Sequence, residues 1–73
     1  MDSLSLSLRN IASAGGSLIV SAKSFDSLSL RNVASAGVKN GANLIIKDAN
    51  HIDSLSCRNI ASANPGHVYF DFT

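Results

Sequence analysis

One short phrase occurs three times in this 73-residue chain, and this repetition constrains the fold more than any other feature of the sequence. The second copy reads DSLSLRNVASAG from Asp26 to Gly37, and the other copies keep its Arg-Asn pair at residues 9–10 and 58–59. The copies recur at the spacing of roughly 20–30 residues that is typical of stacked supersecondary units. We therefore predict a single domain over residues 1–73, made of units near 2–22, 26–49 and 53–73.

A short β-prone run follows each copy of the phrase. The first two runs contain Leu18-Ile19-Val20 and Leu44-Ile45-Ile46, and such branched apolar clusters are typical of strands. Turn-forming residues, among them Asn40-Gly41 and Pro65-Gly66, separate the phrase from the run. We expect strands near residues 17–22, 43–48 and 67–72.

The phrase itself is predicted to form a helix. Asp26 and Asp53 stand where an N-cap side chain accepts hydrogen bonds from the amides of the first helical turn. The apolar residues that follow recur at spacings of three and four, which places them on one face of a helix. We expect helices near residues 4–14, 26–36 and 53–63.

Each expected helix ends at a residue suited to the left-handed conformation, namely Gly15, Gly37 and Asn64. Pro65 then prevents the third helix from continuing. In the first turn of the second helix, Leu28 is expected to cover the core from the end of the helix. Helices this short are marginal alone, so packing on the sheet must stabilise them.

A strand interpretation of the phrase remains open at this point. Residues 3–8 alternate strictly between serine and leucine, which is typical of a half-buried strand. A parallel β-solenoid with about two strands per coil fits the repeat length as well. Alanine and asparagine fill the second half of each copy, and because both are depleted in sheets they favour the helix.

The resulting fold class is α/β, with three helix–strand units forming a small parallel sheet that has its helices on one face. The strands are aligned on Leu18, Leu44 and Val68, whose side chains mark the core face of the sheet. The predicted core consists of these residues together with Leu8, Ile11, Val20, Ala22, Leu30, Val33, Ile46, Cys57, Ile60, Phe70 and Phe72.

The repeated pattern Leu-x-x-Ile-Ala-x-Ala-Gly, followed each time by a strand and varied at single positions in the second and third copies, resembles leucine-rich-repeat-like α/β solenoids, including those of small uncharacterised bacterial open reading frames. The resemblance covers the whole chain, although no copy has the full leucine spacing of the standard motif. It implies a scaffold for binding or assembly, and it carries over no catalytic residue.

The opposite face of the sheet is predicted to carry an uncovered apolar row of Ile19, Ile45 and Tyr69, with Lys47 and Asp71 beside it. Parallel sheets are seldom left with one face in water. An uncovered apolar edge strand is also a template for pairing with another chain. We therefore expect a protein–protein interaction or self-assembly module that forms a homo-oligomer, or binds another protein, through this face and the sheet edge.

Composition supports association and argues against other partners. Disulfides, metals and oligomers are the usual supports of so small a domain, and a single cysteine with no zinc-type spacing leaves the third. A net charge of +1 gives little attraction to nucleic acid or an anionic membrane. The apolar runs are too short to span a bilayer and no secretory signal is visible, so we expect a cytoplasmic location.

The repeated arginines, Arg9, Arg31 and Arg58, suggest an alternative function. On stacked helices they would form a row that binds an anion or a nucleic acid. No aromatic residues interleave with the row, which weakens the nucleic-acid interpretation. A solvated helix face explains the same pattern.

Chemistry of other kinds finds little support. His51, His67 and Cys57 are the only soft metal-ligand candidates, and their spacing matches no zinc motif. Cys57 occupies the position of Leu8 and Leu30 in the other copies, so it is expected to be a buried structural thiol. We expect neither enzymatic activity nor a cofactor.

Overall fold

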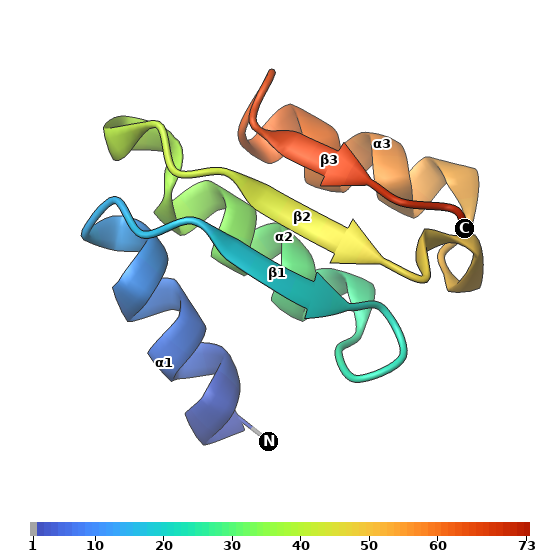
Figure 1. The fold of residues 1–73 in the computed structure, drawn as a ribbon, viewed down its shortest axis with the longest axis horizontal. Coiled ribbons are helices and arrows are strands. Elements are labelled where there is room, and N and C mark those ends of the chain that lie inside the picture. The colour runs from blue at the N-terminus through green and yellow to red at the C-terminus, as the bar shows by residue number, and fades with distance from the viewer. Residues whose placement is uncertain (1) are drawn as a thin grey trace.

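The computed structural model describes residues 2–73, and the three copies of the phrase form its three helices (Figure 1). Helices and strands alternate along the chain as α1 (Asp2–Ser13), β1 (Leu18–Ser21), α2 (Ser27–Ala36), β2 (Leu44–Lys47), α3 (Ser54–Ala63) and β3 (Val68–Phe70). Two short 3-10 helices, Val38–Asn40 and Ala49–His51, flank β2. The helix prediction is therefore confirmed, and the strand interpretation of the phrase is wrong.

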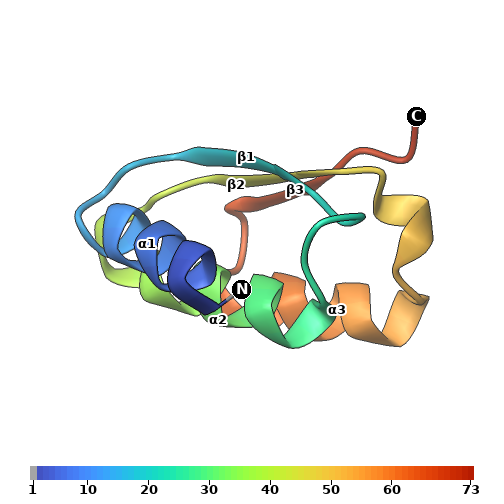
Figure 2. The same ribbon diagram turned by 90° about the horizontal axis from the view of Figure 1, so that it is seen from below.

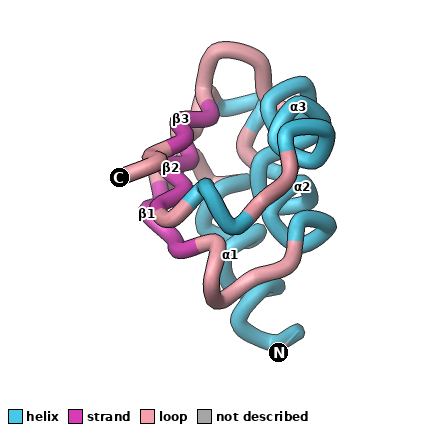
Figure 3. The backbone as a smooth tube through the Cα atoms, turned by 90° about the vertical axis from the view of Figure 1, so that its right-hand side faces the viewer, coloured by secondary structure: helices cyan, strands magenta, loops and turns pink. Residues whose placement is uncertain are grey.

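The elements form two layers, with the sheet on one side and all three helices on the other (Figures 2 and 3). The strands lie in the order β1-β2-β3 and run parallel. Leu18 pairs with Leu44, and Leu44 pairs with Val68, which is the predicted register. Among the described residues, no element covers the second face of the sheet.

Aspartate side chains set the beginnings of α2 and α3, as predicted. The backbone amide of Ser29 donates to Oδ1 of Asp26 at 2.8 Å. In the third unit, the amide and the hydroxyl of Ser56 donate to the Asp53 carboxylate at 3.2 and 2.7 Å. These bonds satisfy amides that the first helical turn leaves without an intrahelical partner.

The helix ends follow the prediction at only one of the three positions. Gly15 has a φ of +96°, and the next amide donates to the carbonyl of Ile11, which closes α1 in the expected left-handed stop. Gly37 has a φ of −91°, so the left-handed prediction is wrong there. A Cβ at Gly37 would lie 2.8 Å from the Cβ of Ala42 and 3.4 Å from that of Ala12. Residue 37 is therefore a glycine because a side chain has no room there, and not because the backbone is left-handed.

Asn64 is also not left-handed, because its φ is −150°. Its buried side-chain amide instead donates to the carbonyl of Ala42 at 3.0 Å, which ties the end of α3 to the segment entering β2. Gly66, two residues later, takes the positive φ of 82°. The turn therefore lies further along the chain than predicted.

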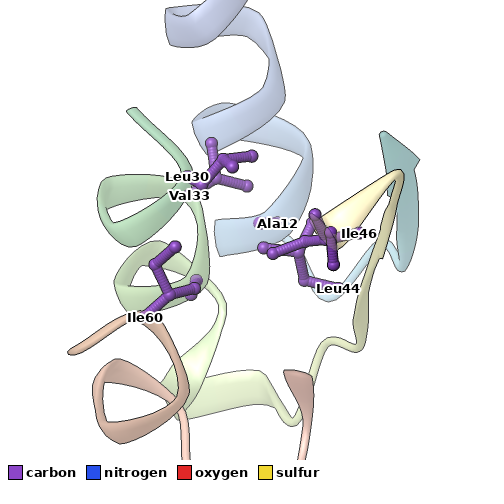
Figure 4. Packing of buried hydrophobic residues seen from close by; sticks show 8 residues of the cluster. Ala12, Leu30, Val33, Leu44, Ile46 and Ile60 are labelled. Carbon is purple, nitrogen blue, oxygen red and sulfur yellow. The ribbon is translucent and has the colours of Figure 1, made fainter. Parts of the chain in front are cut away.

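The core lies between the two layers and centres on β2 and α2 (Figure 4). Leu30, Val33, Ile46 and Ile60 are its largest fully buried apolar side chains. Burying a side chain of this size stabilises the fold by about 1.5–3 kcal/mol. The predicted inner residues of β1 and β3 pack against this cluster while remaining partly exposed.

Several predicted core positions lie elsewhere. Ile11 and Leu28 are exposed on the helix layer, and Leu28 therefore does not cover the core. Phe72 lies beyond the end of β3 and is exposed, although its ring stacks on that of Phe70. Cys57 is half-buried instead of buried.

Candidate functional site: the outer face of the sheet

An apolar row crosses the uncovered face of the sheet. Strand pairing places Ile19 beside Ile45 and Ile45 beside Tyr69. Ile19 and Tyr69 are 67% and 53% exposed, and Ile45 between them is half-buried. This outer row, defined by Ile19, Ile45 and Tyr69, is brought together as the sequence predicted.

A polar row, which was not predicted from the sequence, borders the outer row on the side where the strands begin. The backbone amide of Asn43 donates to the Ser17 hydroxyl at 3.1 Å. The side-chain oxygen of Asn43 lies 2.8 Å from Nδ1 of His67, which completes a hydrogen-bonded chain across the sheet. Each of these residues immediately precedes a strand, and that shared position was the available signal.

Charged and polar groups border the outer row at the other end of the strands. The Ser21 hydroxyl donates to Oδ2 of Asp48 at 2.8 Å, and Lys47 is exposed beside Ser21 in the sheet. Hydrogen bonds from Thr73, helped by the charge of Lys47, lower the pKa of Asp71 below its ordinary value of 3.8. The outer row is therefore an apolar stripe between two polar borders.

The three arginines do not converge on one site. Arg31 lines a groove of about 430 Å³ between α2 and α3, together with polar residues that include Asn59 and Ser62. Arg58 lies outside this groove, and the half-buried Arg9 has a buried Nε without a hydrogen-bond partner. Of the predicted row, the middle arginine therefore lines the polar groove between α2 and α3, and the other two do not share this groove.

A second apolar row, which the sequence analysis also missed, lies on the helix layer. Leu6, Leu28 and Leu55 hold the same position in the three copies of the phrase, three residues before each arginine, and all three are exposed. The leucines of the serine–leucine alternation were the sequence feature from which this exposed row could have been predicted. We expected Leu28 to turn toward the core, whereas a residue in the first turn of a helix can point past the end of the packed layer.

The metal-ligand candidates remain separate. Among residues 2–73, no three His, Cys, Asp or Glu side chains come close enough together to hold a metal ion. The Cys57 thiol lies 3.9 Å from the carbonyl of Ile52. Burial, and then the negative charge of Asp53, raises the pKa of this thiol, which lowers its reactivity as a nucleophile.

Comparisons with known proteins add no relative. No family model matches the chain, and neither a curated protein nor a solved structure matches it. In the described part of the chain, none of the helices has the length and apolar character needed to cross a membrane.

Proposed function

We propose that this chain is a minimal solenoid-type repeat module that self-associates, or binds another protein, through the outer face and edge of its sheet. The exposed outer row of Ile19, Ile45 and Tyr69 carries the proposal. The proposal assigns the module no catalytic step and no cofactor, and it places the module in the cytoplasm, where its unpaired thiol would stay reduced.

The burial pattern of the outer row supports an interface. An apolar stripe bordered by polar groups has the layout of protein–protein contacts, in which a dry centre is surrounded by a polar rim. Two such sheets stacked face to face would lie about 10 Å apart and would cover the apolar row of each copy. A contact of this kind is a closed two-fold dimer.

Tyr69 offers the sharpest test because it is exposed and aromatic in the single chain. Tyr69→Asp should abolish or strongly weaken association measured by size exclusion with light scattering, while circular dichroism retains the helix signal. Tyr69→Phe is the matched control, since it keeps the ring and should keep the assembly. Unchanged association of Tyr69→Asp would refute the role of the outer face.

The groove between α2 and α3 favours a second candidate function, the binding of a small anion. Its lining is mainly polar and includes the positive charge of Arg31. Arg31→Ala should then weaken binding of inorganic phosphate or another small anionic probe, measured by calorimetry. Arg58→Ala removes an equal charge outside the groove and should leave that binding unchanged. Equal losses in both variants would indicate only general charge attraction.

A further inference from the structure

Equivalent positions of the three helices are not equally buried, and the differences depend on which neighbour each helix has. Ile11 of α1 is 46% exposed, whereas Val33 and Ile60, at the same position of α2 and α3, are 2% and 1% exposed. Ile60 lies in one groove with Leu28 and Arg31 of α2, so this position faces the preceding helix. No helix precedes α1 in the structure, and its isoleucine therefore faces solvent.

The opposite gradient marks the positions that face the following helix. Ala12 of α1 is buried, but Ala61, at the same position of α3, is partly exposed. Ser5 is likewise buried, whereas the equivalent Ser54 is exposed. The Cβ of Ala12 lies 3.4 Å from the Cβ position built on Gly37 of the second unit, so this side of α1 contacts the next unit. The same side of α3 has no such neighbour.

The free edges of the sheet repeat this relation. Leu18 of β1 donates its amide to the carbonyl of Asn43, and Leu44 of β2 donates to that of His67, at 2.9 and 2.8 Å. If this pattern continues, the amide of Val68 points outward at the free edge of β3. The carbonyl of Ser17, the residue before β1, points outward at the free edge of β1. In a parallel ladder alternate residues bond to opposite sides, so the two free edges are complementary.

We propose that copies of this chain associate head to tail, with the α3–β3 end of one copy against the α1–β1 end of the next. The sheet and the helix layer then continue in the register of the internal units. Ile11 of one copy then lies beside Leu55 and Arg58 of its neighbour, which correspond to the α2 residues Leu28 and Arg31 beside Ile60 within the chain. The partner is a second copy because the two ends carry the two halves of contacts that the chain already makes within itself.

This end-to-end surface is distinct from the outer row but includes the sheet edge, and the proposal rests on the proposed function in taking the chain to self-associate. A two-fold axis would pair identical edge strands antiparallel, whereas the complementary edges here require parallel pairing of β3 with β1. Such a contact is heterologous, and unless its rotation closes a ring it leaves a free end for every copy added. The assembly therefore grows beyond a dimer as concentration rises.

Two end variants and their mixture test the proposal by sedimentation velocity over a concentration series. Ile11→Arg blocks the α1 end and Ala61→Arg blocks the α3 end, so each variant alone should remain monomeric. An equal mixture still contains one intact end of each kind, and it should form a heterodimer and nothing larger. Asn50→Arg is the control, because Asn50 is exposed in the short 3-10 helix after the central strand and adds the same charge away from both free edges, so it should leave assembly unchanged.

The outcomes separate this proposal from the outer-face contact. Assembly that survives Ile11→Arg or Ala61→Arg alone but is lost in Ile45→Asp overturns head-to-tail association and leaves the outer-face contact standing, because Ile45 lies on the central strand away from both free edges. Assembly that is lost in the end variants but survives the outer-row variant supports head-to-tail association and excludes the outer-face contact. A mixture of the two end variants that stays monomeric overturns the head-to-tail geometry. A wild-type chain that is monomeric throughout overturns it too, while the outer row could still bind a different protein.

Discussion

The two faces of the sheet are made by the same strands and from the same kinds of residue, yet they have opposite surroundings. Ile46 on the inner face is fully buried beneath the helices, whereas its neighbour in sequence, Ile45, faces outward beside the exposed Ile19. Apolar character therefore does not separate core from surface in this chain. What separates them is the topology, which places every helix on one side.

The largest expected effect on stability is the difference between truncating an isoleucine on the inner face and truncating one on the outer face. Ile46→Ala leaves a cavity in the core and should lower the free energy of unfolding by about 2–5 kcal/mol. Because small domains are only marginally stable, this loss should leave a substantial unfolded fraction. Ile19→Ala on the outer face should change the stability of the monomer by less than about 0.5 kcal/mol. Urea denaturation of dilute samples compares the two, and equal losses would contradict the assignment of the faces.

A smaller effect is expected where the helix layer approaches the entry to β2. Gly37→Ala places a methyl group 2.8 Å from the Cβ of Ala42, which must move. Overpacking of this kind should lower the free energy of unfolding by about 1–3 kcal/mol. Ser35→Ala, on the exposed side of the same helix, is the control and should be nearly neutral in the same denaturation experiment. Stabilisation by Gly37→Ala would show that the two layers are not in close contact at this point.

Acidification should produce the smallest effect, and part of it acts on the first turns of α2 and α3. Hydrogen bonds from Ser29 and Ser56 hold the pKa values of Asp26 and Asp53 below the ordinary value of 3.8. A lowered folded-state pKa contributes stability above the unfolded-state value, and that contribution is lost as the pH falls through the folded-state pKa. The urea midpoint should therefore decrease at pH values below 3.8.

The control for this pH dependence is the double variant Asp26→Asn, Asp53→Asn. Asparagine caps a helix about as well as aspartate but does not titrate in this range. The double variant should fold at neutral pH and lose less of its urea midpoint on acidification than the wild-type chain does. An identical loss in both proteins would mean that other carboxylates cause the acid sensitivity.

Much of the fold could be predicted because it depends on local signals repeated three times. The aspartate caps, the helix spacing and the aligned branched residues each recur, and a pattern seen in several copies outweighs an ambiguous one such as the alternation in residues 3–8. The register of Leu18, Leu44 and Val68 followed from the same alignment. The outer row follows from that register and from the period of two along a strand.

The missed features depend on contacts between units, which the repeat alone does not show. Gly37 is small because Ala42 approaches it, and Asn64 is buried because its amide reaches the carbonyl of Ala42. The repeat predicts equal burial for equivalent positions, and therefore a core position for Ile11 like that of Val33, although no helix of the structure covers Ile11. A repeat predicts what each unit can contact, while its position in the array decides which contacts it makes.

The most direct test of the account is the molar mass of the wild-type chain in solution, measured by light scattering over a dilution series from millimolar to micromolar. We propose that further copies of the chain cover the outer face of the sheet, the sheet edge, or both. We therefore predict a mass that rises with concentration above the 7.6 kDa of the single chain. A mass that stays at 7.6 kDa at every concentration would contradict self-association.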